Sequence, residues 1–299
     1  CLHVPGRHRT EIRNQYVLDL SRQDVRDAIV AMLSKILKEV PISYIKWDMN
    51  RPLTEMGSAK LASDQQREIS YRYVLGVYDM MERLTTAFPD ILFEGCAGGG
   101  ARFDPGILYY MPQIWTSDNS DAIERLKIQY GTSFAYPLST IGAHISASPN
   151  HQCGRVTPLE TRGNVAMSGN FGYELDLTTF TEEEKKAVRH QVEFYKKHRK
   201  LIQTGDLYRL KSPFEGNETA WMIVAPDKSE AFVMYVQVLA LPNPALPVLK
   251  LAGLDPKAQY AIEGQTGYQS RGDQLMQAGI RLPTSWGDFQ SAIWILRRI

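Results

Sequence analysis

The sequence predicts an α/β fold in which a parallel β/α barrel, lacking its first strands, is followed by a small antiparallel β domain. Apolar strand-like runs alternate with amphipathic helical patterns over the first two-thirds of the 299 residues. This order favours a parallel sheet covered by helices. After residue 205 the pattern changes to short alternating segments separated by turn residues, which is typical of antiparallel strands.

Six apolar runs in the first part have the length and composition of strands. They are residues 15–20, 42–48, 91–96, 113–118, a diffuse run within 134–146, and 172–177. In the C-terminal part, strands are expected at 219–224, 231–238, 257–262 and 291–296.

Helices are expected between the strands. Ser21 and Asp24 form a capping-box pattern, and an apolar stripe with helical spacing follows from Val25 to Leu37. Further helices are expected at 64–88, 121–130 and 182–204.

The last of these helices suggests a domain boundary. Thr181 with Glu184 predicts its start, and Gly205 is the expected C′ residue. The predicted domains are residues 1–205, a partial catalytic barrel, and 206–299, the β domain.

The number of β/α units is too small for a closed barrel. Eight units normally occupy roughly 250 residues, whereas about six units are recognisable here in about 200 residues. The sequence also begins without Met, so we expect the natural protein to continue upstream. A doubly wound open sheet is the alternative, but no Gly-rich phosphate turn follows the first strand.

Composition excludes several kinds of partner. Thirty-four Lys and Arg against 33 Asp and Glu leave a formal net charge of +1, so no general field attracts nucleic acid or an anionic membrane. The 3 cysteines include no CxxC pair and favour a reducing compartment, and we expect a cytoplasmic location. No apolar run reaches the length of about 18 residues that a membrane helix needs. A partner that is uncharged or small is expected.

Two carboxylates end apolar runs that are expected to be strands. They are Asp48 and Asp118. Because the carboxyl ends of barrel strands meet at the face that holds the active site, both are expected to reach one pocket. Two carboxyl groups around a small neutral substrate are typical of glycoside hydrolysis. For either Asp alone, capping of the following helix is an equally good interpretation.

Neighbouring side chains favour a catalytic interpretation of Asp48. Lys46, Asp48 and Asn50 alternate along the chain and are expected to share a face. An ammonium group nearby favours the ionised carboxylate that a nucleophile requires, and Lys46 and Asn50 can bond substrate hydroxyls. Aromatic rings suit the apolar faces of sugars. Four rings are expected beside the strand ends: Trp47, Tyr109, Tyr110 and Trp115.

Other candidate sites are less specific. Three consecutive glycines at 98–100 allow close backbone approach to a ligand, but no phosphate-loop pattern or immediate helix accompanies them. Cys96 has no neighbouring His and is expected to be a buried small residue rather than a nucleophile. His144, His151 and Cys153 match no compact zinc pattern, so no metal site is expected.

Long segments of the sequence resemble one known family. The segments are KWDMNR, CAGGGARFDPG, YYMPQIWTSDNSDAIERLKIQYGTS, AHISASPNHQCGR and NFGYELDL. They are similar to the α-galactosidases of glycoside hydrolase family 36, and the resemblance extends from Arg13 to about Gly279.

This resemblance implies a fold and an activity. The fold is a (β/α)8 TIM barrel followed by a C-terminal β-sandwich, with a further N-terminal β domain in full-length members. The activity is the retaining, double-displacement release of terminal α-D-galactose from melibiose and raffinose-type galactosides, without a metal or organic cofactor. By motif position, Asp48 matches the nucleophile and Asp118 the acid/base. Full-length enzymes of this kind are commonly tetramers, so a homo-oligomer is expected.

The resemblance also implies the substrate-binding residues. Arg13, Lys46 and Asn50 match residues that hold the galactose hydroxyls or the nucleophile. Cys96 and Gly99 match positions beside the C2 hydroxyl. With Trp115 as an aromatic candidate, these residues complete the expected sugar site.

The sequence departs from the family pattern at several points. Ala97 and Ala101 replace a more usual Ser and Gly, and Asn119-Ser120 replaces a more usual acidic-Thr pair. The family's acidic pair for the C4 and C6 hydroxyls, and its sugar-stacking Trp near the second barrel strand, have no counterpart here. We therefore expect the 299 residues alone to show little or no activity.

Two alternative functions stay open. An α-N-acetylgalactosaminidase or a galactosyl-transferring relative would use the same two Asp residues, and the room around Cys96 and Gly99 would decide for the first. In the second alternative, the 299 residues alone are a catalytically incomplete fragment that only binds sugar.

Overall fold

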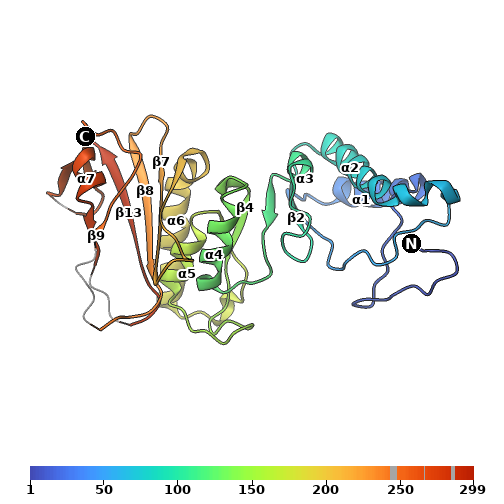
Figure 1. The fold of residues 1–299 in the computed structure, drawn as a ribbon, viewed down its shortest axis with the longest axis horizontal. Coiled ribbons are helices and arrows are strands. Elements are labelled where there is room, and N and C mark those ends of the chain that lie inside the picture. Colours follow the sequence, from blue (N-terminus) through green and yellow to red (C-terminus); the bar gives the residue numbers. More distant parts are fainter. Residues whose placement is uncertain (243–247, 266, 284–286) are drawn as a thin grey trace. The chain divides into compact units, whose positions relative to one another are not determined.

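A computed structural model describes residues 1–242, 248–265, 267–283 and 287–299 of the chain (Figure 1). Contacts divide these residues into two compact units, Cys1–Trp115 and Thr116–Ile299. None of the helices in the described ranges has the length and apolar character needed to cross a membrane.

The first unit alternates parallel strands with helices. Strand β1 (Tyr44–Asp48) pairs in parallel with β2 (Leu92–Cys96), and β2 pairs in parallel with β3 (Gln113–Trp115). The helices of this unit are α1 (Gln23–Glu39), the short 3-10 helix η1 (Ser63–Glu68), α2 (Ile69–Ala87) and α3 (Pro105–Tyr110).

One hydrophobic core holds these elements together. Met80, Met81 and Leu84 lie on one face of α2 and are at most 2% exposed. They pack in the same core as Phe93 of β2 and Ile114 of β3. Helix α2 therefore packs against the parallel strands through the apolar face that the sequence pattern predicts.

The second unit begins with further β/α elements. Strands β4 (Ile141–Ile145) and β5 (Asn170–Tyr173) are parallel. The predicted capping box at Thr181 and Glu184 is confirmed, because each side chain accepts a hydrogen bond from the other residue's backbone N–H. The helices here are α4 (Ala122–Thr132), η2 (Leu138–Thr140), α5 (Leu159–Ala166), η3 (Leu177–Thr179) and α6 (Glu182–Thr204).

A six-stranded antiparallel sheet follows in the same unit, with strand order β11-β10-β13-β8-β7-β6. A second sheet pairs β12 with β9. The elements are β6 (Asp206–Lys211), β7 (Glu218–Val224), β8 (Glu230–Gln237), β9 (Val248–Leu249), β10 (Gln259–Ile262), β11 (Gln269–Arg271), α7 (Gly272–Gln277), β12 (Ile280–Arg281) and β13 (Gln290–Arg298).

Both faces of the six-stranded sheet are buried. Met222 of β7 packs in a core with Leu249 of β9 and Leu275 of α7. Its neighbour Trp221 points to the other face and packs with Leu126 of α4 and Leu201 of α6. Helices therefore cover one face, and α7 with the small sheet covers the other (Figure 1).

The predicted first strand, 15–20, does not form. Gln15 makes an isolated bridge to Ile12, and its carbonyl accepts a hydrogen bond from the Arg51 guanidinium. The Val17 carbonyl accepts from the backbone N–H of Leu2. These partners are scattered and form no continuous ladder, so the strand-like composition of the segment does not produce a strand.

Three other expected strands have different bounds. The run 113–118 ends at Trp115, the run within 134–146 is limited to β4, and the run 172–177 is shifted to β5. Asp118 thus lies in the loop after β3 and does not end the strand. The Ser117 Oγ accepts a hydrogen bond of 3.1 Å from the Asn119 N–H, and such local bonding competes with a strand ladder.

The ends of two helices also differ from expectation. Helix α1 begins at Gln23 without a side-chain cap, because the Ser21 hydroxyl donates to Asp19. Gly205 follows α6 with φ −82°, so it is not a left-handed C′ residue. A Cβ atom there would lie 2.6 Å from the Cγ2 of Ile223, and close packing of α6 on β7 explains this glycine.

The apolar stripe of α1 is only partly buried. Leu37 is buried, whereas Met32 and Ile36 are 58% and 43% exposed.

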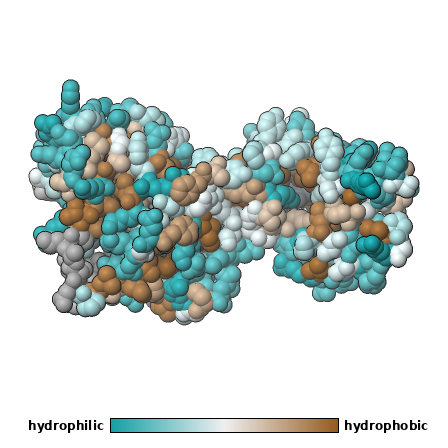
Figure 2. Space-filling model, viewed as in Figure 1, coloured by the Kyte–Doolittle hydropathy of each residue, from teal (hydrophilic) through white to brown (hydrophobic). Residues whose placement is uncertain are grey.

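Hydrophobic residues lie among hydrophilic ones on the visible face of both units (Figure 2).

Candidate active site

Lys46 and Asp48 form one cluster with two residues of the neighbouring strand. In the parallel register of β1 and β2, Lys46 pairs with Glu94 and Asp48 pairs with Cys96. Glu94, which is 1% exposed, is not among the site residues expected from the sequence. The signal for it is the alternation that selected Lys46, because Glu94 stands two residues before Cys96.

The thiol of Cys96 forms a hydrogen bond with the Asp48 carboxylate. Burial, and then the hydrogen bond that the thiol donates to Asp48, raise the pKa of Cys96 to about 11. The backbone N–H of Gly99 donates in turn to the sulfur. Cys96 is therefore a neutral hydrogen-bond donor near pH 7 and not a thiolate nucleophile.

The ammonium group of Lys46 lies over the ring of Trp115, with 5.3 Å between Nζ and the ring centre. Trp115 is only 4% exposed. Its indole orients Lys46 by a cation–π contact.

Asn50 joins the loops that follow β1 and β2. Its Oδ1 accepts a hydrogen bond of 3.4 Å from the backbone N–H of Gly98. Gly98 and Gly99 have positive φ values of 57° and 78°, which residues with a Cβ atom rarely adopt. The glycine run therefore brings backbone N–H groups close to Asn50 and Cys96.

Arg13 lies on a tight turn that a buried arginine holds in place. Arg13 and Asn14 both have φ 56°, and the Arg13 guanidinium donates to the Asn50 carbonyl at 3.3 Å. Arg51 is 8% exposed and donates to the carbonyls of Thr10 and Gln15, at 3.2 and 2.8 Å. Arg51 thus fastens both ends of the turn that presents Arg13.

Two cavities open beside these residues in the first unit. One of 340 Å³ is lined by Asp48, Asn50 and Arg102, among others. The second, of 570 Å³, is lined by Asn50, Gly98 and Arg102. Both volumes lie within the range of about 300–1,000 Å³ that is typical of small-molecule sites.

Arg102 is a further residue that is not among those expected from the sequence. Its guanidinium donates to the carbonyls of Trp47 and Cys96, at 2.9 and 3.1 Å, and burial lowers its pKa. It therefore ties together the ends of the two strands that carry Asp48 and Cys96.

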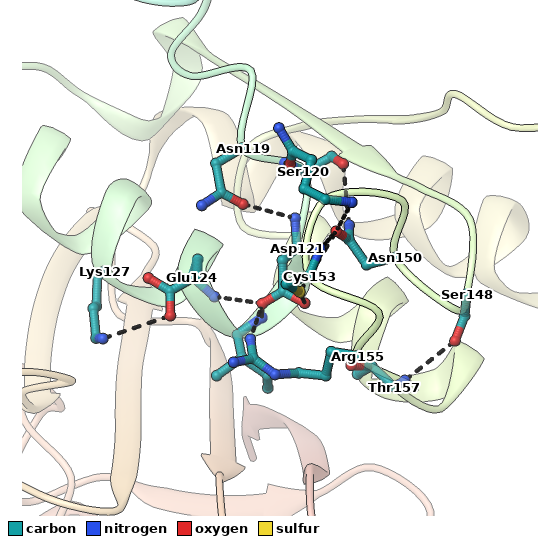
Figure 3. Close-up of polar contacts among 12 residues, drawn as sticks. Asn119, Ser120, Asp121, Glu124, Lys127, Ser148, Asn150, Cys153, Arg155 and Thr157 are labelled. Carbon is teal, nitrogen blue, oxygen red and sulfur yellow. Dashed lines mark hydrogen bonds and ion pairs between the residues drawn. The ribbon is translucent and has the colours of Figure 1, made fainter.

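Asp118 is the one predicted site residue of the second unit. Its loop leads into α4, where the carboxylate of Asp121 accepts hydrogen bonds from the N–H groups of Ile123 and Glu124. Asp121 is 2% exposed and also pairs with the guanidinium of Arg155 (Figure 3). The helix-capping role considered for Asp118 belongs to Asp121.

Two tyrosines expected beside the strand ends lie elsewhere. Tyr109 and Tyr110 end α3, before β3 begins. The ring of Tyr110 lies 5.6 Å from that of Tyr78 in α2, and Tyr109 is 78% exposed. Helix α3 leads back to the start of the next strand, so its last residues cannot lie at the strand's carboxyl end.

The described residues contain no group of three or more His, Cys, Asp or Glu side chains placed to hold a metal ion. The Nδ1 of His144 lies 2.6 Å from a Glu174 carboxylate oxygen. The Cys153 sulfur lies 3.6 Å from a carboxylate oxygen of Asp121.

Comparison with known families gives two matches along the chain. Residues 1–205 match the melibiase family. Residues 218–296 match the C-terminal domain of glycosyl hydrolase family 36.

Individual relatives are similar over the whole chain. It is 59% identical over 299 residues to the α-galactosidase AgaA of Geobacillus stearothermophilus, and 50% identical over 301 residues to α-galactosidase 1 of Pediococcus pentosaceus. The crystal structure of AgaA superposes with a TM-score of 0.97 over 100% of this chain and 41% of its own, at 58% identity. A variant of AgaA has been crystallised with raffinose at the same TM-score.

These comparisons confirm the predicted fold class, in which parallel β/α barrel units are followed by an antiparallel β domain. The chain covers 41% of the length of AgaA and 40% of the length of the Pediococcus relative.

Proposed function

The chain belongs to the melibiase family, within glycoside hydrolase family 36, and on this premise we propose that it carries the catalytic residues of a retaining α-galactosidase. The observation that carries the proposal is the cluster of Lys46, Asp48 and Cys96 on one face of two paired strands, beside a cavity that Asp48 lines. Closely similar relatives are named α-galactosidases.

Asp48 is the proposed nucleophile. Its carboxylate attacks the anomeric carbon of the galactosyl group while the bond to the leaving oxygen breaks. The thiol of Cys96 donates a hydrogen bond to this carboxylate. The bond between Asp48 and the anomeric carbon breaks again when the covalent intermediate is hydrolysed.

Asp118 is the proposed acid/base. In the first step its carboxyl group gives a proton to the leaving oxygen. In the second step its carboxylate takes a proton from water, whose oxygen attacks the anomeric carbon and frees Asp48. Two inversions at one carbon retain the anomeric configuration.

Terminal α-galactosides of the melibiose and raffinose type are the proposed substrates. Complexes of AgaA variants with raffinose and stachyose support this assignment by analogy. Arg13, Lys46 and Asn50 bind the galactose hydroxyls in this proposal, and Cys96 and Gly99 stand beside the C2 hydroxyl. Trp115 contributes to the site by orienting the side chain of Lys46.

The organisation of the protein is also a proposal. A barrel domain at 1–205 and a β domain at 206–299 are supported by the two family matches. A homotetramer and a cytoplasmic location, with no nucleic-acid partner, complete the proposal, and sedimentation of the natural protein tests the oligomeric state.

Product analysis by NMR tests the reaction, with the natural protein that contains this chain acting on melibiose. The first-formed galactose is expected to be the α-anomer, and a β-anomer would exclude a retaining mechanism. Asp48→Ala is expected to abolish turnover, whereas Asp90→Ala, an exposed position before β2, is expected to leave it unchanged.

A further inference from the structure

The loop that carries Asp118 is held by an amide side chain from a different loop. The Nε2 of Gln152, which follows β4, donates to the carbonyl of Asp118 at 3.0 Å. The Oε1 of the same side chain accepts from the backbone N–H of Ser120 at 3.1 Å. One amide thus bonds the peptide groups on either side of Asn119.

Gln152 is itself held in position by Asn150, which is 5% exposed. The Oδ1 of Asn150 accepts from the backbone N–H groups of Gln152 and Cys153, at 2.9 and 3.2 Å. Its Nδ2 donates to the Ser120 hydroxyl at 3.3 Å. Figure 3 shows Asn150, Ser120 and Cys153 gathered at this junction. The two loops are therefore joined by both side chains.

Two arginines fix the flanks of the same loop. Arg125 is buried and donates to the Ser117 carbonyl at 3.3 Å, and Arg155 pairs with Asp121. These contacts secure residues before and after Asp118, whereas Gln152 bonds the peptide of Asp118 itself.

We propose that Gln152 is a positioning residue that aims Asp118 at the leaving oxygen; this rests on the proposed role of Asp118. Gln152 is exposed, so its amide would otherwise bond water at little cost in stability. Proton transfer, in contrast, depends steeply on geometry, and a displacement of about 1 Å can cost on the order of 100-fold in rate. The two hydrogen bonds are therefore expected to matter more for catalysis than for folding.

Leaving-group dependence provides the test, because an activated leaving group needs no proton. In the natural protein, Gln152→Met keeps the side-chain length and removes both hydrogen bonds. We expect its kcat/KM to fall by about 10–100-fold for methyl α-galactoside, and to change by less than about threefold for dinitrophenyl α-galactoside. A merely structural role would lower both values alike.

Two variants complete the experiment. Gln277→Met changes an exposed glutamine of α7 that makes no side-chain hydrogen bond to the described residues, and it is expected to alter neither value. Asp118→Ala is expected to show the same leaving-group dependence as Gln152→Met, more strongly. If Asp118→Ala lacks it, the acid/base assignment fails and the inference with it. If Asp118→Ala shows it and Gln152→Met lowers both substrates equally or neither, the positioning role alone is excluded.

Discussion

The thiol of Cys96 lies opposite the Asp48 carboxylate in the register of β1 and β2 and donates a hydrogen bond to it. A thiol at this place gives the carboxylate a hydrogen-bond donor without adding a charge. Lys46, two residues earlier on the same strand, has its ammonium group over the ring of Trp115. The hydrogen bond that the Asp48 carboxylate receives from the neighbouring strand therefore comes from a neutral group.

Cys96 is expected to resist alkylation. A pKa of about 11 leaves only about 0.1% thiolate at pH 8, compared with about a quarter for an unperturbed thiol. Cys1 and Cys153 are exposed. With iodoacetamide at pH 8 and mass spectrometry of the peptides, Cys1 and Cys153 are expected to react far faster than Cys96. In denaturant all three are expected to react alike, and equal rates in the folded protein would contradict the proposed environment.

Replacement of Arg51 is expected to weaken both the fold and substrate binding. Arg51→Met leaves the carbonyls of Thr10 and Gln15 without their donor, and each such loss costs about 1–3 kcal/mol. Because the turn bearing Arg13 is then less well held, KM is expected to rise several-fold more than kcat falls.

Chemical denaturation and steady-state kinetics measure these two effects, and hydrogen exchange reports on residues 10–15. Arg9→Met is the matched control, because Arg9 is an exposed arginine of the same segment. Unchanged KM in Arg51→Met would exclude a role for Arg51 in presenting Arg13.

Acid is expected to destabilise the second unit through His198 of α6. His198 is 2% exposed, and neither ring nitrogen has a hydrogen-bond partner in the described part of the chain. Burial is the main cause that lowers its pKa, and the nearby charges are Lys197, Glu263, Glu230 and Arg297. His198 is therefore protonated below about pH 6.5 in the unfolded chain, whereas in the folded chain it binds a proton only at lower pH.

Stability from this group is complete above about pH 6.5 and falls as the pH decreases below it, by up to about 1.4 kcal/mol per pH unit. His198→Phe, which keeps a ring beside Phe194, is expected to remove this dependence. Denaturation midpoints between pH 5 and 7.5 measure the effect, with exposed His190→Phe as the control. Parallel pH profiles for the natural protein and His198→Phe would show that His198 does not titrate on unfolding.

The residues near Asp48 could be predicted because their signal is local. An apolar run that ends in Asp48, with Lys46 two residues earlier, indicates a strand end and a shared face whatever surrounds it. The segment 15–20 has a similar composition, but a strand also needs a continuous ladder with residues that are distant in sequence. The backbone groups of this segment bond to scattered partners instead. Composition alone cannot separate the two cases.

The supporting residues could not be predicted for a related reason. Arg51, Arg102 and Gln152 bond backbone groups of segments up to 55 residues away, and no spacing pattern encodes such contacts. An exposed glutamine such as Gln152 is indistinguishable in sequence from any solvated surface residue. Only the arrangement of the loops gives it a role.

Replacing Gly76 of α2 by Ala is expected to lower stability, the opposite of the usual effect of a glycine-to-alanine change in a helix. In a helix interior this change normally stabilises by about 1 kcal/mol. A Cβ atom at Gly76, however, would lie 2.0 Å from the Leu20 carbonyl oxygen, so the helix or the segment before α1 must shift. Gly76→Ala is therefore expected to destabilise the protein by about 1–3 kcal/mol.

Gly131→Ala in α4 is the matched control, because a Cβ atom there meets nothing within 4 Å, and it is expected to stabilise the protein. Thermal denaturation of both variants measures the difference, and a higher Tm for Gly76→Ala would show that α2 does not pack closely against Leu20.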